Sequence, residues 1–227
     1  MRQLVRWALL ALPVAAACNS STTTPANSAE LRVINASPDA GPLDVYVGGA
    51  LAVDSLPYEF ANPYVFVQSG TIDVAVRAHN AINVLVETSP TYNAGQFYTF
   101  IAAGTSAALS AVELVDDTTA APSGSFKLRM VHLAPAGPAM DLYYTGPADD
   151  LNAVTPIAAA VAFKGTTNYL TPAIGSARIR ITQAGTKTVL IDSGTLTFSN
   201  GQVSTVFVLG DQSTGGGAPY KGVFQNP

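Results

Sequence analysis

The sequence predicts an all-β protein made of two tandem antiparallel β-sandwich domains, Ig-like or transthyretin-like in architecture. Three observations favour this fold class: a stretch that recurs in the second half of the chain, segments in which apolar and polar residues alternate, and turn residues between those segments. The chain has 19 glycines and 15 prolines among its 227 residues, and 48% of its residues are hydrophobic. It therefore has many potential turns and enough apolar side chains to bury a core.

The repeat is clearest where each copy begins. Residues 31–49 read LRVINASPDAGPLDVYVGG, and residues 128–146 read LRMVHLAPAGPAMDLYYTG. Six of these 19 aligned positions are identical, among them Arg32 with Arg129, whereas chance gives about one. The spacing between the copies widens further along, and the extra residues are expected in a longer loop at 148–164. A tandem duplication predicts two similar domains.

Each copy is expected to consist of short strands. In 72–77, and again in 177–182, apolar residues alternate with polar or small ones. A period of two residues is typical of a strand with one buried face. The other predicted strands are 31–35, 43–47, 64–68, 82–87, 96–102 and 108–115 in the first copy, and 220–224 near the end of the second. About seven short strands per copy, without sustained helical periodicity, indicate sandwiches.

Composition also predicts where the domains begin and end. We expect them at 30–117 and 126–227, with a polar, turn-rich linker at 118–125. The adjacent carboxylates Asp116 and Asp117 are interpreted as solvated charge where the linker begins. Each predicted domain has a normal size for an independent unit, so a modest interface and some relative motion are expected.

The N-terminal segment predicts export. Residues 1–17 combine two early arginines with an apolar run that is too short to span a bilayer, as in a lipoprotein signal peptide. The sequence VAAAC at 14–18 resembles a bacterial lipobox, and Cys18 is the only cysteine of the chain. We expect cleavage before Cys18, lipid attachment to it, and a flexible tether over 18–29. The alternative is an ordinary secretory signal with a chance cysteine.

The expected location is therefore the bacterial cell envelope. Two acyl chains on one cysteine are enough for stable anchoring, whereas a single chain is not. We expect the protein at the outer membrane, on its periplasmic or surface side, with its membrane contact made through the N-terminal lipid.

Four stretches carry a resemblance to a known family: LRVINASPDA at 31–40, LDVYVGG at 43–49, Tyr64 with Gly70, and GQFYTFIAAG at 95–104. Together they resemble the bacterial domain-of-unknown-function 4397 family. The resemblance implies envelope proteins, often lipoproteins or wall-anchored, that often carry tandem copies. It implies no activity. The second copy departs from the pattern in the turn after its first strand, where His132 replaces Asn35.

One polar pair occurs in both copies and is the candidate binding face. Asp44 and Tyr46 are two residues apart on a predicted strand, so their side chains share a face. Asp141 and Tyr143 repeat the pair. In a ligand-binding role, the tyrosine would stack on a sugar and the aspartate would hydrogen-bond to it. In a structural role, which is commoner for such groups, the aspartate accepts hydrogen bonds from turn amides and the tyrosine covers the sheet.

The remaining polar residues are too sparse and dispersed to predict catalysis. His79 and His132 lie at non-equivalent places in the two copies, and the chain has no G-x-S-x-G motif. We therefore predict no catalytic residue, no cofactor and no metal site. A formal charge of −4, with only 11 Lys and Arg, argues against nucleic acid as a partner.

The predicted function is a non-catalytic envelope lipoprotein that binds or spaces a glycan or protein partner. Two copies would double the contacts with a repetitive polysaccharide. Two alternatives stay open: an envelope hydrolase that uses Asp44 or Asp141, and a purely structural spacer or adhesin. A hydrolase needs a deep pocket where two carboxylates, or a carboxylate and His79 or His132, converge. A binding protein can use a flat or grooved aromatic face.

Overall fold

The computed structural model describes residues 25–227, so the predicted signal peptide and Cys18 lie outside the described residues. Within this range the chain forms seventeen strands and three single-turn 3₁₀ helices, at Ser106–Ala108, Leu151–Ala153 and Gln212–Thr214. The all-β fold class is confirmed. Among the helices of this range, none is long and apolar enough to cross a membrane.

The first half of the chain, up to residue 117, forms two four-stranded sheets and one small sheet. Their strand orders are β10-β9-β1-β4, β3-β2-β6-β7 and β5-β8. The strands are β1 Ser28–Ala36, β2 Leu43–Val47, β3 Ala50–Leu56, β4 Val65–Gln68, β5 Gly70–Thr71, β6 Val74–Ala78, β7 Val84–Thr88, β8 Thr91–Tyr92, β9 Phe97–Ala103 and β10 Ser110–Asp116.

The second half, from residue 118 on, repeats the two large sheets. Their strand orders are β11-β16-β17 and β13-β12-β14-β15. The strands are β11 Lys127–His132, β12 Met140–Thr145, β13 Ala158–Val161, β14 Gly175–Gln183, β15 Val189–Phe198, β16 Val203–Asp211 and β17 Gly217–Gln225.

Besides the two-residue strands β5 and β8, two strands lie where the sequence predicted none. β3 is an edge strand whose residues are mostly exposed, so it shows little apolar alternation. β13 lies inside the loop expected at 148–164 and consists of three alanines and a valine, a composition that favours neither strand nor turn. Pairing with β2 and β12 holds both strands in place.

The predicted antiparallel pairing holds for most neighbours but not for one pair in each half. β1 runs parallel to β9, and β11 runs parallel to β16. Parallel neighbours need a long connection, which here passes through the facing sheet. A pattern of alternating residues does not show which strands are neighbours, so the sequence could not reveal these two pairs.

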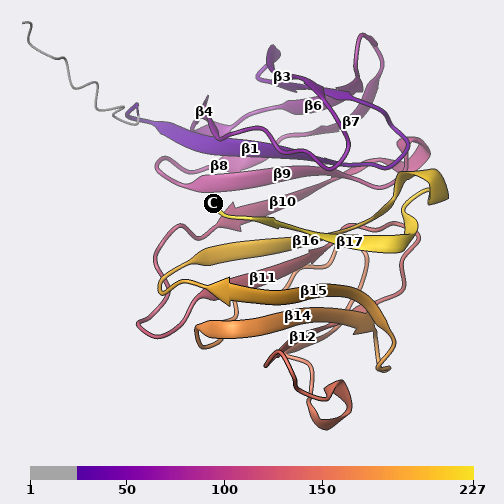
Figure 1. Cartoon of the computed structure of the whole chain (residues 1–227). Coiled ribbons are helices and arrows are strands. Elements are labelled where there is room, and N and C mark those ends of the chain that lie inside the picture. The colour runs from indigo at the N-terminus through magenta and orange to yellow at the C-terminus, as the bar shows by residue number, and fades with distance from the viewer. Residues whose placement is uncertain (1–24) are drawn as a thin grey trace, which may run out of the picture.

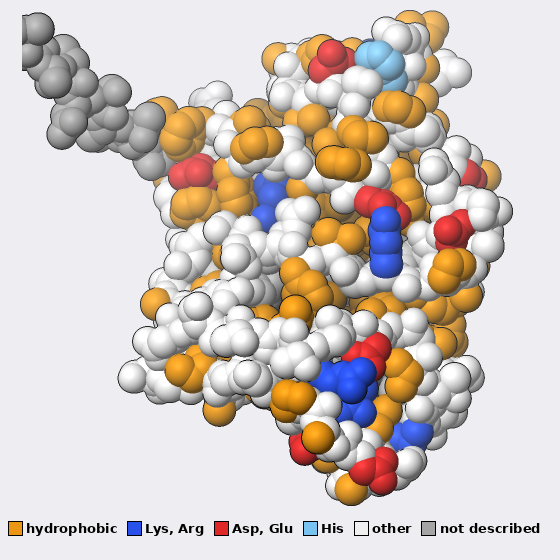
Figure 2. Space-filling view, in the orientation of Figure 1, with side chains coloured by type: hydrophobic (Ala, Val, Ile, Leu, Met, Phe, Trp, Pro, Cys, Tyr) orange, Lys and Arg blue, Asp and Glu red, His pale blue; other side chains and the backbone are white. Residues whose placement is uncertain are grey.

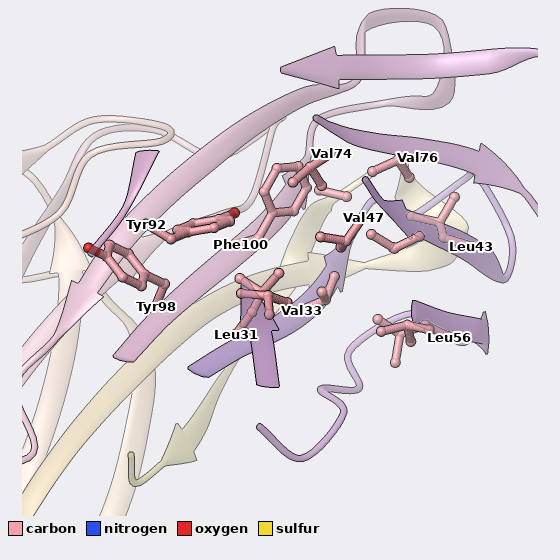
Figure 3. Packing of buried hydrophobic residues seen from close by; sticks show 14 of the residues in the cluster. Leu31, Val33, Leu43, Val47, Leu56, Val74, Val76, Tyr92, Tyr98 and Phe100 are labelled. Atoms are coloured by element: carbon pink, nitrogen blue, oxygen red, sulfur yellow. The ribbon is translucent and has the colours of Figure 1, made fainter. Parts of the chain in front are cut away.

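A separate apolar core lies between the two large sheets of each half. In the first half it includes Leu31, Val74 and Phe100, none of which has any exposed surface (Figure 3). In the second half Ile179 of β14 and Val206 of β16 belong to the corresponding core. The apolar residues of the predicted strand patterns supply most of both cores.

A third apolar core joins the halves. On β1 and β9 the side chains that alternate with those of the first core, such as Ile34 and Ile101, are buried in one cluster with Val131 and Phe207 of the second half. These strands are therefore buried on both faces. Figure 1 shows the sheet of β9 and β10 stacked on the sheet of β16 and β17. The halves are therefore joined by a shared apolar cluster, whereas the sequence analysis expected only a modest interface.

A buried ionic cluster crosses the same interface. Asp116, the last residue of β10, accepts hydrogen bonds from Arg129 and Thr99, and Arg32 Nη2 lies 3.5 Å from its Oδ2. The Tyr64 hydroxyl also donates to Asp116 Oδ2, at 2.6 Å. The Asp116 side chain has no exposed surface. Its interpretation as solvated linker charge is therefore wrong, because Arg32 and Arg129, one from each copy, enclose it.

One pair of contacts across the interface is equivalent in the two halves. Arg129 Nη1 donates to the carbonyl of Val115 on β10, and Arg32 Nη1 donates to the carbonyl of Asn226, which follows β17, both at 3.0 Å. Each arginine comes from the first strand of one half and reaches the last strand of the other. The duplicated halves thus associate much as the subunits of a twofold-symmetric dimer do.

The turn after the first strand is held in the same way by different residues. In the first half, Asn35 Oδ1 accepts a hydrogen bond from the Ser37 amide at 3.0 Å. In the second half, His132 Nδ1 lies 3.3 Å from the Ala134 amide, and its Nε2 lies 2.8 Å from the Pro138 carbonyl. His132 is fully buried. The ring therefore accepts at Nδ1 and donates at Nε2. His132 departs from the family pattern but holds the same turn that Asn35 holds in the first half.

Burial of His132 predicts a pH-dependent stability. Desolvation lowers the pKa of His132 below its ordinary value of 6.5, although the hydrogen bond to Pro138 opposes the shift. Below pH 6.5 His132 is protonated in the unfolded chain more readily than in the folded chain. The free energy of unfolding is therefore highest above this pH and falls as the pH drops below it. His132→Asn, which restores the residue of the first copy, should flatten the profile in chemical denaturation between pH 4.5 and 7.5. An unchanged profile would contradict this assignment.

Candidate functional site

The carboxylate of Asp44 holds two turns. Asp44 lies on β2 and is 5% exposed. Its Oδ1 accepts a hydrogen bond from the Ser55 amide at 2.8 Å, and its Oδ2 accepts one from the Asn80 amide at 3.2 Å. Ser55 and Asn80 both have positive φ angles, 51° and 62°. Asp44 therefore fixes one left-handed residue in β3 and another after β6.

Asp141 does the same in the second half. It is 4% exposed, and its two oxygens accept hydrogen bonds from the amides of Ala160, at 2.7 Å, and Gly185, at 2.9 Å. These two residues also have positive φ angles, 53° and 72°. The duplicated aspartates thus have the same pair of local hydrogen-bonding partners, and these contacts are structural.

The two tyrosines of the candidate binding face are covered by cationic side chains. Arg77 lies over the Tyr46 ring, with 4.4 Å between the guanidinium carbon and the ring centroid. Lys187 Nζ lies 4.6 Å from the Tyr143 centroid and 3.2 Å from its hydroxyl oxygen. Tyr143 is only 2% exposed. A sugar could stack on either ring only after displacing the cation that covers it.

The structure brings His79 to Asp44, one of the carboxylate–histidine pairs that the hydrolase alternative considered. His79 Nδ1 lies 2.9 Å from Asp44 Oδ1 and 3.4 Å from Asp54 Oδ1. Burial raises the pKa of Asp44, but hydrogen bonds from Ser55, His79 and Asn80 together lower it below its ordinary value. The carboxylate therefore stays ionised beside the imidazole. Asp54 and His79 are more exposed, at 66% and 32% of their side-chain surfaces.

The second half has a groove between two edge strands, β15 and β17. One hollow of about 310 Å³ is lined by core residues, among them Ile179 and Val206, and by Tyr220 and Phe224 of β17. A second hollow of about 270 Å³ shares Phe224. Figure 2 shows hydrophobic side chains exposed in the strip between these strands. The groove is therefore elongated and has an apolar floor.

Polar side chains line the same groove. They are Asp192, Ser193, Lys221, Gln202, Ser204, Thr197 and Asn226. Aromatic rings combined with amide, hydroxyl and carboxylate groups are typical of sites that bind polar organic ligands. Since Tyr220, Gly222 and Phe224 alternate along β17, they lie on one face of the strand, and the glycine leaves space between the rings.

The first half differs at the matching place. Glu113 of β10 pairs with Phe100, and Phe224 of β17 pairs with Val206 in the same register, so Glu113 and Phe224 are equivalent. Glu113 Oε1 accepts a hydrogen bond from Thr88 of β7 at 3.3 Å, which bridges the two edge strands. In the second half the exposed ring of Phe224 replaces the carboxylate of that bridge.

The sequence analysis predicted the strand at 220–224 but not its role. The available signal was the spacing of two aromatic residues around a glycine on one strand face. These two aromatic residues line a groove only because β15 and the core residues lie beside them, and neither is adjacent in sequence.

Comparisons with known proteins identify a family but no activity. The family model described as "Domain of unknown function (DUF4397)" matches residues 29–143, which cover the first half and the start of the second. No curated protein matches the chain.

Two solved structures show weak similarity. One is described as "Alpha-glucan binding by a streptococcal virulence factor", with 11% identity and a TM-score of 0.28, covering 78% of this chain and 91% of that one. The other is CBMbc (family CBM26) from Eubacterium rectale Amy13K in complex with maltoheptaose, with 12% identity and a TM-score of 0.27, covering 87% and 98%. Both TM-scores are too low to bear on this chain's function.

Proposed function

We propose that this chain, which belongs to the DUF4397 family of domains of unknown function, is a non-catalytic carbohydrate-binding protein of the bacterial cell envelope. In this proposal the halves 30–117 and 126–227 are tandem β-sandwich modules joined by the segment 118–125. Lipid on Cys18 anchors them, and the groove between β15 and β17 holds the ligand.

The observation that carries the proposal is the pair of aromatic rings over the open edge of the second core. Phe224 is 37% exposed, although it lines the groove together with the buried side chains of Phe198 and Val206. Tyr220 lines the same groove and packs against the second core, which holds its ring in place. Preformed aromatic surfaces of this kind bind the apolar faces of sugar rings at little cost in conformational entropy.

The polar groups of the groove fit the hydroxyls of a sugar chain. Asp192 accepts hydrogen bonds from Arg178 and from the Gly194 amide, so its carboxylate is oriented at the rim. The hydrogen bonds from Arg178 and Gly194 lower the pKa of Asp192, against a rise from burial, so the group is an anionic acceptor at neutral pH. Ser204, Gln202 and Asn226 form a hydrogen-bonded row beyond Phe224.

A non-catalytic role is supported by the state of the carboxylates that a hydrolase would use. Asp44 and Asp141 are 5% and 4% exposed, and both accept hydrogen bonds from two backbone amides. A general acid or base must reach the substrate proton directly or through one water. Such buried and occupied groups are poorly placed for that role.

A pull-down on isolated envelope polysaccharides and peptidoglycan tests the proposal. We expect the lipid-free mature chain to bind one of these polymers, and Tyr220→Ala and Phe224→Ala to weaken binding at least about tenfold each. Phe224→Glu, which restores the first-half residue, should have the same effect. Tyr46→Ala and Tyr143→Ala serve as matched aromatic controls and as tests of the alternative binding face.

The outcomes separate the candidate functions. Binding lost in the groove variants but kept in the Tyr46 and Tyr143 variants supports the groove. Loss only in the latter two would move the site to the Asp44 and Asp141 face. Absence of binding to every polymer would favour the spacer role, and polymer turnover abolished by Asp44→Asn or Asp141→Asn would contradict the non-catalytic proposal.

The membrane anchor has a separate test. Mass spectrometry of protein purified from its native membrane should find an N-terminal peptide that begins at an acylated Cys18, because the lipobox-like sequence directs cleavage before this residue. Cys18→Ser should release the protein from the membrane fraction. An unmodified Cys18 within a longer N-terminus would contradict the anchor.

A further inference from the structure

We propose that the first half binds a Zn²⁺ ion through Asp44, Asp54 and His79, at the end of the β2–β3–β6 sheet away from the groove. This inference is independent of the carbohydrate site. It departs from the sequence analysis, which predicted no metal site.

The distances between the ligand atoms fit a small tetrahedral ion. One oxygen of each carboxylate and one ring nitrogen of His79 lie within 4.8 Å of one another. Bonds of roughly 2.0–2.2 Å to zinc place neighbouring tetrahedral ligands about 3.3–3.5 Å apart. His79 Nδ1 is 3.4 Å from Asp54 Oδ1 and 2.9 Å from Asp44 Oδ1. The shorter separation has to widen by a few tenths of an ångström, and the third, between the two carboxylates, is within 4.8 Å and closes on the ion as the exposed Asp54 side chain turns.

The carboxylate of Asp44 is held in place for such an ion. The Ser55 and Asn80 amides each donate to one of its oxygens, which fixes the plane of the group. Each carboxylate oxygen can accept a further bond. Zinc would take the place of the proton on His79 Nδ1 and leave both amide bonds intact, and second-shell donors of this kind orient a metal ligand.

The remaining two ligands lie on the solvent side. The Asp54 and His79 side chains keep 66% and 32% of their surfaces exposed. An ion can therefore enter from solvent without any rearrangement of the core. Three protein ligands leave the fourth tetrahedral position for water or for an external group.

The duplicated half offers an internal comparison. Ala160 and Gly185 donate to Asp141 as Ser55 and Asn80 donate to Asp44, so these pairs are equivalent. The residues just before them, Ala159 and Ala184, therefore correspond to Asp54 and His79. Both halves keep the structural aspartate, but only the first adds a second carboxylate and an imidazole beside it.

The donor set selects the kind of ion. Calcium takes six to eight oxygens and magnesium a nearly ideal octahedron of oxygens and waters. One imidazole with two carboxylates suits zinc or a neighbouring transition ion instead. We therefore commit to Zn²⁺, with Co²⁺ as its spectroscopic probe.

Calorimetric titration of the metal-free mature chain with Zn²⁺ tests the site. We expect one ion per chain, and a loss of affinity of at least tenfold in both His79→Gln and Asp54→Asn. Asp54 is exposed and His79 is half-buried, and both lie outside the apolar core, so the fold should persist, which circular dichroism can check. Asp150→Asn, at an exposed carboxylate of the second half, is the matched control and should bind as the wild type does. Co²⁺ should give the visible absorption of a tetrahedral site in the wild type and in Asp150→Asn only.

Two results would overturn the inference. One is no zinc binding by the wild type at millimolar Zn²⁺. The other is equal affinity in the wild type, His79→Gln and Asp54→Asn, which would place the ion elsewhere. Carbohydrate binding by the His79→Gln variant shows separately whether the proposed function stands.

Discussion

Asp116→Ala is expected to lower the free energy of unfolding by about 3–5 kcal/mol, because it leaves two buried arginines without their shared carboxylate. Arg32 and Arg129 both contact Asp116, and the side chain of each has only 5% of its surface exposed. Tyr64 and Thr99 lose their acceptor in the same substitution. Since the arginines belong to different halves, we expect both halves to be destabilised together.

The neighbouring carboxylate provides a matched control. Asp117 pairs with Lys127, but 36% of its side-chain surface is exposed. Exposed ion pairs contribute about 0–1 kcal/mol, so Asp117→Ala should have little effect. Urea denaturation followed by circular dichroism compares the two variants directly. Equal destabilisation by both would contradict the role of Asp116 at the interface.

Asp141→Ala is expected to cost about 2–6 kcal/mol, because two backbone amides lose a buried acceptor, at about 1–3 kcal/mol each. The donors are Ala160 and Gly185, whose left-handed conformations Asp141 holds. Asp149 is the control, since it is exposed and accepts one hydrogen bond from the nearby Gly146 amide. Asp149→Ala should cost less than about 1 kcal/mol.

The same experiment separates the two roles considered for the duplicated aspartates. Thermal denaturation of Asp141→Ala measures its structural contribution, and a binding assay on the folded fraction measures any contribution to a ligand. A large loss of stability with retained binding supports the structural role. Retained stability with lost binding would instead assign Asp141 to a ligand site.

Local features of the fold could be predicted from the sequence. The strand predicted at 43–47 coincides with β2, and the duplication of Asp44 in Asp141 reflects the same hydrogen bonds in both halves. Such features depend on residues close in sequence or on a pattern along one strand. The edge strands β3 and β13 escaped prediction because partner strands, and not their own residues, hold them in place.

Features that depend on distant residues could not be predicted. The burial of Asp116 requires Arg32, Arg129 and the third core, all of which exist only once the halves pack together. The groove at Phe224 and the cluster around His79 likewise form only when strands far apart in sequence come together. Composition alone assigned Asp116 to solvent.

The duplicated halves have kept one scaffold and diverged at its edges. Both retain the aspartate that accepts hydrogen bonds from turn amides, and both retain the arginine that crosses the interface. The bridge from Thr88 to Glu113 between the edge strands of the first half has no equivalent carboxylate in the second, where Phe224 occupies the position. The exposed aromatic groove is therefore a property of the second half, and we expect ligand binding in that half alone.

An NMR titration of the isotope-labelled mature chain, with an oligosaccharide from the polymer that it retains, tests this assignment most directly. We expect saturable changes in the amide shifts of β15 and β17, centred on Tyr220 and Phe224, and none in the shifts around Tyr46. Changes centred on Tyr46 and Tyr143, or no saturable change at all, would contradict it.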